Sequence, residues 1–322
     1  MCLKHQGETA MSFDISVQVP VRNGGDRFRK FLASLAAQDL QKPWELVIVD
    51  DGSDLAVQEE FLQELESLPD LCSVKVVAIN PGGNRPAARN SAYMASEASV
   101  ALLMDGDLEF GPSLLREHLA VREKTGADVV MGRRVNAWGE TATPWQKWFD
   151  TRAMGDSPPG EFPWNYFITG NLSVTSTLLK QAGGFDTAID RYGGEDTEMG
   201  YRLKQMGVSF YWDPLLSVNH LDSVTVTQHS GKMLEYGGTG LKYTLQKHPE
   251  IKGLLGSRWV EPVFSKPAYL FPMRILTRIA LFSPVYRAVL AFMEKHRRPQ
   301  VLFTYLAVGA CLIGLRGGDY RK

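Results

Sequence analysis

The sequence has few cysteines, almost no net charge and no apolar leader. Its three cysteines, Cys2, Cys72 and Cys311, are far apart and odd in number, which argues against a disulfide framework and against a thiolate metal site. A formal net charge of −1 leaves no basic footprint for nucleic acid. Residues 1–13 are polar and predict a disordered segment, not a signal peptide. We therefore expect a cytoplasmic protein that does not bind nucleic acid.

Two glycine-rich phosphate-binding motifs are missing as well. No G-x-G-x-x-G follows the first apolar run, and no G-x-x-x-x-G-K occurs, so a dinucleotide-binding fold and a P-loop both lose support. The sequence does have enough apolar residues to form a hydrophobic core. Its 322 residues are 44% hydrophobic and 22% charged, which is enough for one large core with an appendage.

Strand and helix patterns alternate through the first half of the chain. This order predicts an α/β fold, with a Rossmann-like, mostly parallel sheet flanked by helices. We expect one domain over 14–250, with halves 14–110 and 111–250, and a C-terminal helical appendage over 251–322. The predicted strands of the first half are 15–20, 44–49, 74–78 and 102–104, and the predicted helices are 28–35, 59–68 and 86–95.

The apolar run 102–104 ends in Asp105 and Asp107, separated by Gly106. In open α/β sheets ligands bind beyond the carboxyl ends of the strands. If the chain stays extended here, the two carboxylates point to the same side. Two such oxygen ligands suit Mg²⁺ or Mn²⁺ bridging a diphosphate. The alternative is that Asp-Gly-Asp merely makes a turn.

A second acidic pair, Asp50 and Asp51, follows the predicted strand 44–49. The two acidic clusters together fit a nucleotide. One cluster would hold the base and the ribose, and the other would hold the metal of the diphosphate.

Four motifs together resemble the family 2 glycosyltransferases, which have the type A nucleotide-sugar-binding fold and invert the sugar's configuration. They occur in the expected order within residues 14–222. The resemblance implies transfer of a sugar from a nucleoside diphosphate sugar, a UDP sugar, with help from Mn²⁺ or Mg²⁺. The four motifs are Val19-Pro20-Val21-Arg22-Asn23, Val47 to Ser53, Ala87-Ala88-Arg89-Asn90 and Met104 to Asp107.

The resemblance also implies a role for each matching residue. Asp51, or its neighbour Asp50, would accept a hydrogen bond from the base or ribose, and Arg89 would reach the base or the diphosphate. Asp105 would touch the ribose or the metal, and Asp107 would bind the metal.

Pro20 and Arg22 belong to the first motif and would also contact the donor. Many relatives carry an aromatic residue where Arg22 stands, and an arginine can stack on the base through its guanidinium plane. The alternative for both Arg22 and Arg89 is surface or structural pairing.

The second half supplies the candidate base. Gly170 and Asn171 begin a strand of small residues that fits close approach of a ligand, and the resemblance places them beside the donor sugar. Further on, two glycines precede Glu195 and Asp196 at a predicted helix start. In relatives the second acid of this pair is the general base, and Glu195 would orient it or hold the acceptor. We expect the helix dipole to keep the pKa of Asp196 low; the alternative is a helix start with acids in its first turn.

Two histidines are candidate metal ligands. His220 follows the predicted base at the distance where many relatives place a third ligand, and imidazole suits Mn²⁺. His229 is the weaker candidate. Residues 222–240, rich in Ser, Thr and Gly, are a candidate lid that would exclude water.

Aromatic residues gather in 137–167, where core packing is the favoured interpretation and a sugar-acceptor platform the alternative. From Pro267 onward the tail alternates apolar residues with Arg274 and Arg278; the apolar residues are Tyr269, Leu270, Phe271, Ile275, Ile279 and Leu281. Val301 to Leu315 is almost wholly apolar but falls short of the ~20 residues that a spanning helix needs. Basic residues flank it. We expect peripheral contact with the inner face of the cytoplasmic membrane, with a helical cap on the core and a membrane span as alternatives.

The sequence therefore predicts a metal-dependent inverting glycosyltransferase that acts on a hydroxyl of a glycan or lipid-linked acceptor, in cell-surface polysaccharide synthesis. A sugar-1-phosphate nucleotidyltransferase is one rival. It would need a basic, glycine-rich loop after the first strand, and Arg22-Asn23-Gly24-Gly25 is a poor version of one. A non-catalytic module that binds nucleotide sugars or glycans is the other rival, and it would not need Asp196.

Overall fold

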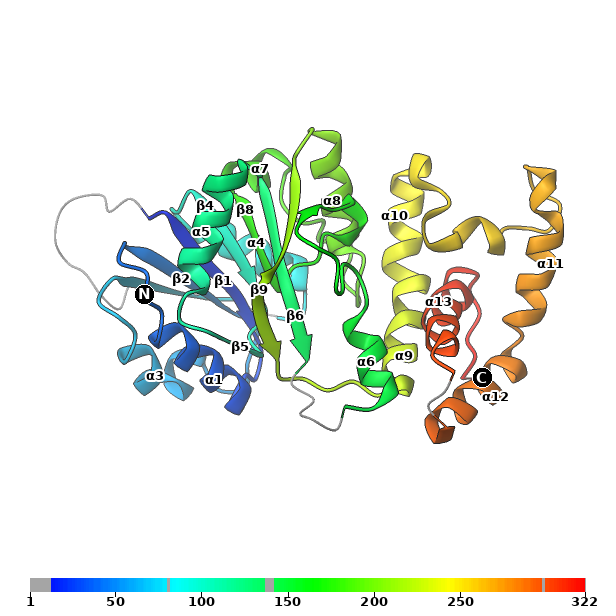
Figure 1. Cartoon of the computed structure of the whole chain (residues 1–322), viewed down its shortest axis with the longest axis horizontal. Coiled ribbons are helices and arrows are strands. Elements are labelled where there is room, and N and C mark those ends of the chain that lie inside the picture. The colour runs from blue at the N-terminus through cyan, green and yellow to red at the C-terminus, as the bar shows by residue number, and fades with distance from the viewer. Residues whose placement is uncertain (1–12, 80–81, 137–141, 297–298, 322) are drawn as a thin grey trace. The chain divides into compact units, whose positions relative to one another are not determined.

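The computed structural model describes residues 13–79, 82–136, 142–296 and 299–321. The chain divides into two compact units (Figure 1). Unit 1 comprises Met1–Ala137, Asp150–Asp190 and Asp196–Asp222, and unit 2 comprises Trp138–Phe149, Arg191–Glu195 and Ser223–Lys322. The boundary expected at residue 250 therefore falls inside unit 2.

Unit 1 is built on a nine-stranded sheet in the order β3-β2-β1-β4-β8-β6-β9-β5, with β7 paired to β9. The first four strands are parallel, as the alternating pattern predicted. The second half is mixed, because β8 runs antiparallel to both β4 and β6, and β9 is parallel to β6 but antiparallel to β5 and β7. The strands are β1 (Ile15–Val21), β2 (Trp44–Asp50), β3 (Cys72–Ala78), β4 (Val100–Met104), β5 (Leu108–Phe110), β6 (Val129–Asn136), β7 (Gly160–Glu161), β8 (Asn171–Thr175) and β9 (Phe210–His220).

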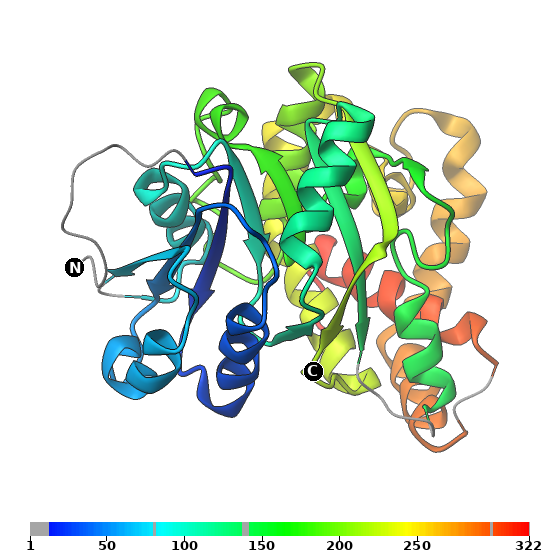
Figure 2. The same cartoon turned by 60° about the vertical axis from the view of Figure 1, so that its left-hand side comes forward.

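Helices lie on both faces of this sheet (Figures 1 and 2). Every residue of β2 is buried, and successive side chains enter opposite cores: Ile48 packs with the helix α1 residue Phe28, whereas Val47 packs with Ala88 of α4. The helices of unit 1 are α1 (Gly25–Ala36), α2 (Val57–Glu60), α3 (Leu62–Glu66), α4 (Arg85–Ala95), α5 (Leu114–Thr125), the 3₁₀ turn Trp164–Tyr166, α7 (Ser176–Gln181) and α8 (Glu195–Gln205), whose first residue belongs to unit 2.

The helix expected over 59–68 is two short helices, α2 and α3. The break falls at Phe61, whose backbone leaves the helical region at φ −121° and ψ 27°. The Phe61 ring is fully buried and meets the ring of Phe28 edge-on, with centroids 5.0 Å apart. Core packing of one aromatic side chain thus accompanies the departure from the helical pattern.

Unit 2 is helical, and its core is formed around α13. Leu306, Ala310 and Ile313 of α13 pack with Leu234 of α9 and Tyr286 of α12. The apolar run Val301–Leu315 is therefore a core helix of this unit, and membrane contact by the tail stays a prediction. The elements are α6 (Pro144–Asp150, whose last residue belongs to unit 1), α9 (Val226–Tyr236), a π-helical segment (Gly237–Leu241), α10 (Lys242–Lys247), 3₁₀ segments (Pro249–Ile251, Leu254–Val260, Ala268–Leu270), α11 (Phe271–Ala280), α12 (Ser283–His296) and α13 (Val301–Leu315).

Residues 222–240, expected to form a lid, are mostly helical. Thr225 and Gln228 form a capping box at the start of α9. Glycines then allow α9 and α13 to approach closely, since a Cβ on Gly237 would lie 1.8 Å from the carbonyl oxygen of Cys311. These contacts fix the segment within unit 2.

The aromatic segment contributes mainly to cores, as favoured. Trp145 is buried in unit 2, and Phe162 and Phe167 are buried in unit 1. Trp148 and Phe149 pack on the core of unit 2, Trp164 packs on that of unit 1, and Tyr166 is exposed. Trp138 lies outside the described residues.

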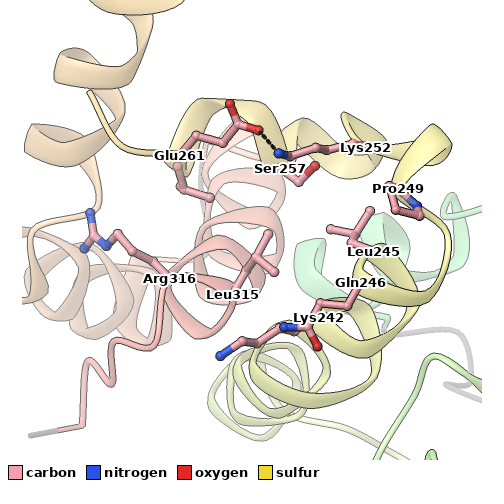
Figure 3. A pocket seen from close by; sticks show the side chains of 10 residues that line it. Lys242, Leu245, Gln246, Pro249, Lys252, Ser257, Glu261, Leu315 and Arg316 are labelled. Carbon is pink, nitrogen blue, oxygen red and sulfur yellow. Dashed lines mark ion pairs between the residues drawn. The ribbon is translucent and has the colours of Figure 1, made fainter. Parts of the chain in front are cut away.

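Within the described residues, no single helix has the length and apolar character to cross a membrane. Residues Ala268–Ala280 and Ser283–His296 meet those criteria only as a pair bent by 60°. Unit 2 also holds a cavity of about 380 Å³ whose lining includes Lys242, Leu245, Lys252, Leu315 and Arg316 (Figure 3). None of the predicted donor or catalytic residues lines it.

Candidate active site

Asp105 lies just beyond the carboxyl end of β4 and is held by two arginines. Its Oδ1 accepts a hydrogen bond from Arg89 of α4 at 3.0 Å, and its Oδ2 accepts one from Arg134 of β6 at 2.9 Å. Arg89 is buried, whereas Arg134 is partly exposed. Both oxygens of Asp105 are thus engaged by cations of unit 1. A contact of Asp105 with the ribose or the metal stays a prediction.

Arg134 is a candidate site residue that the sequence analysis missed. The signal available was its position, since it follows Arg133 directly after the apolar run 129–132 on a strand of the sheet. Only the three-dimensional sheet brings β6 within reach of the end of β4, because β8 lies between them.

Gly170 makes room for the ion pair between Asp105 and Arg134. Its φ is +124°, a conformation that L side chains rarely adopt. A Cβ here would lie 2.7 Å from Oδ2 of Asp105 and 2.9 Å from Nη1 of Arg134. A close approach of a ligand was predicted at Gly170. In the structure it is the side chains of Asp105 and Arg134 that come close to this glycine.

Asp107 and His220 come together through the pairing of β5 with β9, in which Leu108 lies opposite His220. His220 Nε2 is 3.3 Å from Asp107 Oδ2, and its Nδ1 is 2.9 Å from Oδ1 of Asn136. Burial raises the pKa of Asp107, but the hydrogen bond and charge of His220, together with the charge of Arg134, outweigh it. The net pKa is lower than that of an ordinary aspartate.

Asp196 lies in the first turn of α8 and is held by Thr169. The hydroxyl of Thr169 donates to its Oδ1 at 2.9 Å, and the backbone N–H of Thr169 donates to its Oδ2 at 3.1 Å. Although these bonds and the charge of Arg89 lower the pKa of Asp196, desolvation by the protein atoms packed around it dominates and raises that pKa. Our expectation of a pKa kept low by the helix start was wrong, because desolvation and the nearby Asp105 charge outweigh the stabilising contacts.

Arg89 connects the two halves of this site. It bonds Asp105, and its charge also acts on Asp196, as does the charge of Asp105. Arg89 Nε and Nη1 are buried and have no hydrogen-bond partner among the described residues. Buried donors without a partner are rare in proteins and fit an anionic ligand.

Several predicted donor residues have their side chains engaged elsewhere in unit 1. Asp50 accepts hydrogen bonds from the backbone N–H groups of Ser53 and Val57, at 2.9 and 3.2 Å, and so fixes the loop after β2. Asp51 Oδ1 accepts from the backbone N–H of Gly83 at 2.8 Å. These contacts give both carboxylates a role in shaping loops at the carboxyl edge of the sheet.

Asn171 is buried in a polar network. Its Nδ2 donates to the carbonyl of Leu216 at 2.7 Å, and its Oδ1 lies 3.0 Å from Nε2 of His118. Burial lowers the pKa of His118 to about 4, so this ring is neutral near neutral pH. The side chain of Asn171 thus joins strands and a helix, and its donor-binding role stays a prediction without contacts to support it.

The remaining predicted residues are placed as follows. Pro20 of β1 is half-buried and pairs in register with Val49, whereas Arg22 is exposed. Glu195 is buried at the start of α8. His229 belongs to unit 2, where its ring packs among aromatic rings.

The donor set at Asp107 and His220 fits a divalent cation only in part. Among the residues that the structure describes, no group of three or more His, Cys, Asp or Glu side chains could hold a metal ion. One carboxylate and one imidazole suit Mn²⁺ or Mg²⁺ when phosphate oxygens and water supply the other ligands. The residues that the structure describes therefore offer part of a coordination shell and no closed metal cage.

Comparison with known sequences gives two family matches. The family described as Glycosyl transferase family 2 matches residues 16–185, just over half of the chain. A second one, described as the N-terminal domain of galactosyltransferase, matches residues 153–229.

Curated relatives share about a quarter of the aligned residues. An uncharacterised glycosyltransferase of Bacillus subtilis is 25% identical over 244 residues, covering 61% of this chain and 61% of the relative. Validoxylamine A glucosyltransferase of Streptomyces hygroscopicus is 26% identical over 223 residues, covering 60% of this chain and 52% of the relative. Chondroitin synthase of Pasteurella multocida is 24% identical, with 61% of this chain matching 23% of that protein. The chain thus spans at most about three fifths of these relatives.

Solved structures share the fold. A mannosyltransferase from Pyrobaculum calidifontis, in complex with GDP-Man and Mn²⁺, superposes with a TM-score of 0.60 at 18% identity, covering 97% of this chain and 90% of that one. TarS from S. aureus, in complex with UDP-GlcNAc, gives a TM-score of 0.55 at 17% identity, covering 96% and 93%. The predicted α/β fold class, with its C-terminal helices, is confirmed.

Proposed function

Because the chain belongs to glycosyl transferase family 2, we propose that it transfers a sugar from a nucleoside diphosphate sugar to a hydroxyl group, with inversion at the sugar carbon. The observation that carries this proposal is the position of Arg89. Arg89 is buried and pairs with Asp105, and its charge also acts on Asp196, where it opposes the rise in pKa. One arginine therefore acts on both carboxylates, that of Asp105 near the donor and that of the proposed base Asp196.

In this mechanism Asp196 is the general base. Its ionised carboxylate takes the proton of the acceptor hydroxyl as the hydroxyl oxygen bonds to the sugar carbon, while the bond from that carbon to the phosphate oxygen breaks. A pKa raised toward neutral makes a carboxylate a stronger base, provided that the ionised form is still populated. Thr169 fixes the orientation of the carboxylate through its two donors.

Arg89 is the proposed anion-binding residue. Its unpartnered Nε and Nη1 would donate to the diphosphate, whose charge increases as the nucleoside diphosphate leaves. Arg134, on the opposite oxygen of Asp105, keeps that carboxylate fixed. We assign Asp105 to orienting these arginines and the ribose.

We further propose that the enzyme depends on a divalent cation. Asp107 and His220 would hold Mn²⁺ or Mg²⁺, which would supply Lewis-acid neutralisation of the diphosphate when bound. An aspartate is ionised at neutral pH, as a metal ligand must be, and His220 would bind the cation as a neutral imidazole.

The donor is proposed to be a UDP sugar, because the TarS structure holds UDP-GlcNAc; the mannosyltransferase structure holds GDP-Man, so GDP sugars are the competing set. For the acceptor we propose a glycan or a lipid-linked sugar, as in the assembly of cell-surface polysaccharide. A cytoplasmic location remains part of the same proposal.

The test measures release of nucleoside diphosphate from a panel of UDP and GDP sugars, with and without Mn²⁺. We expect release to require the cation. Asp196→Asn should lower kcat by about 10²–10⁴-fold with little change in the KM for the donor. Asp26→Asn, at an exposed first-turn position of α1, is the matched control and should retain wild-type kcat.

Three results would overturn the proposal or a part of it. Full transfer activity in Asp196→Asn would show that Asp196 is not the general base. Nucleotide-sugar binding without transfer by the wild type, with Asp196→Asn leaving function unchanged in cells, would favour a binding module. Release of pyrophosphate from a nucleoside triphosphate and a sugar phosphate would assign the chain to the nucleotidyltransferases instead.

A further inference from the structure

Helix α11 of unit 2 turns polar side chains inward and apolar side chains outward. This is the reverse of the usual arrangement in a helix exposed to water. Its inward positions are polar: Arg274 is fully buried and Thr277 is buried. Its outward positions are apolar, with Leu276 and Ile279 exposed to 60% and 63%. A surface helix of a globular protein normally turns its apolar side to the core, so the outward side of α11 requires an apolar environment.

The inward arginine is firmly held, which fixes the orientation of the helix. Arg274 Nη2 donates to Oε2 of Glu261 at 2.8 Å, and its Nε donates to the carbonyl of Arg258 at 3.2 Å. Rotating α11 to bury Leu276 would break this buried ion pair and leave a charge without its partner. The exposure of the apolar side is therefore built into the packing of unit 2.

The apolar surface continues beyond α11. Phe282, exposed to 58%, follows its end, and Phe264 and Tyr269 precede its start. A cavity of about 450 Å³ is lined by Phe264, Tyr269, Phe271 and their neighbours. We call the exposed side chains of Phe264, Tyr269, Leu276, Ile279 and Phe282 the apolar face.

The charges of the same segment all have one sign. Residues 262–293 contain four basic residues, Lys266, Arg274, Arg278 and Arg287, and no aspartate or glutamate. Lys266 and Arg287 are exposed, and neither has an acid of the segment to neutralise it. A segment with exposed apolar side chains and exposed cations, flanked by Glu261 and Glu294, has the composition of a surface that binds anionic lipid.

We infer that the apolar face of unit 2 docks on an anionic lipid bilayer, with Leu276 and Ile279 entering the acyl boundary and Lys266 and Arg287 contacting lipid phosphates. A second copy of the chain is disfavoured, because a two-fold symmetric contact through this segment would gather the cations of both copies without an acid from 262–293 to pair with them. Such docking would hold the enzyme where a lipid-linked acceptor is found, but it does not depend on the transfer reaction.

The experiment is flotation of the full chain with two kinds of vesicle, phosphatidylcholine alone and phosphatidylcholine mixed with phosphatidylglycerol. We expect binding to the mixed vesicles and little binding to the neutral ones. The double variant Leu276→Glu with Ile279→Glu should lose binding about tenfold or more, since it places charge at the acyl boundary. Leu62→Glu with Met94→Glu, at apolar positions of unit 1 exposed to 47% and 64%, is the matched control and should bind like the wild type.

Two single variants keep the apolar face intact. Lys266→Ala and Arg287→Ala should each weaken binding to the mixed vesicles roughly fivefold. Wild-type protein that binds neither vesicle, or a double glutamate variant that floats like the wild type, would overturn the inference. A wild-type dimer in solution that the double glutamate variant dissociates would also overturn it, by making the face a protein contact. Because the donor site is in unit 1, nucleoside diphosphate binding measured on the same variants separates this outcome from failure of the proposed reaction.

Discussion

At the scale of single residues, two arginines and one glycine fix the charge and the geometry around Asp105. Arg89 and Arg134 engage its two oxygens, and Gly170 leaves the space for them. Asp196 is the opposite case, since its surroundings disfavour the ionised form. A carboxylate with a raised pKa is the feature that a general base needs, and its cost to stability can be measured.

Asp196→Asn should stabilise the fold at neutral pH. The folded-state pKa of Asp196 is raised above its unfolded value, so its contribution to stability is complete below the unfolded pKa and is lost as pH rises through the folded pKa. We expect Asp196→Asn to melt at a higher temperature than the wild type at about pH 7, with the difference shrinking towards about pH 4. A less stable Asp196→Asn at neutral pH would contradict the raised pKa.

Gly170→Ala should destabilise the fold more than a glycine-to-alanine change at another positive φ where the new Cβ has no close neighbour. The new Cβ would crowd Asp105 and Arg134 at a positive φ, and we expect a loss of about 2 kcal/mol or more in the free energy of unfolding. Gly126→Ala is the control, because Gly126 also has a positive φ but nothing within 4 Å of its added Cβ. It should cost about 1 kcal/mol. Equal losses in urea denaturation would show that the ion pair does not occupy the space.

At the scale of elements, α9 and α13 pack so closely in unit 2 that glycine is required at their contact. A Cβ on Gly314 would lie 2.1 Å from the carbonyl oxygen of Leu234. The same contact holds α9 (Val226–Tyr236) and α13 (Val301–Leu315) in the core of unit 2. A lid role for 222–240 and membrane contact by the tail stay predictions.

Gly314→Ala should therefore loosen unit 2. We expect a loss of roughly 1–3 kcal/mol from overpacking, seen as faster proteolysis within residues 223–321. Gly231→Ala, on α9 with nothing within 4 Å, is the matched control and should gain about 0.5–1 kcal/mol from helix propensity. If Gly314→Ala resists proteolysis as well as Gly231→Ala does, the two helices are not in close contact in solution.

At the scale of the whole molecule, the chain combines a sheet unit that carries the candidate site with a helical unit that carries the apolar face. The charged side chains that meet around Asp105 and Asp107 all come from unit 1. Ligand binding at that site stabilises unit 1 directly. It should raise the stability of the whole chain only if the chain unfolds through the unfolding of unit 1.

UDP together with Mn²⁺ should raise the melting temperature of the wild type. At a concentration about 100 times the dissociation constant, one bound ligand adds about 2.7 kcal/mol to the stability of the unit that binds it. Asp107→Asn should abolish the part of the shift that depends on Mn²⁺ and leave the smaller shift with UDP alone. GDP producing the larger shift would transfer the proposal to GDP sugars, and a cation effect that survives in Asp107→Asn would refute the proposed metal ligands.

The sequence by itself determined the order of the strands and helices in the first half and the position of its acids. Strands of a parallel sheet that are buried on both faces appear as apolar runs, and Asp50 and Asp105 follow such runs directly, so a local pattern was sufficient. The resemblance carried by four motifs identified the family for the same reason, since each motif is a short continuous stretch.

Only the tertiary structure decided which side chains meet and what charge they favour. Arg134 reaches Asp105 because β8 brings β6 and β4 into one sheet, and the pKa of Asp196 depends on desolvation by residues distant in sequence. The same holds for the tail, where burial of α13 against α9 and the buried ion pair of Arg274 leave the apolar side of α11 outward. Contacts between distant segments set burial, and burial sets both the pKa values and the exposed surface, so no local pattern could predict them.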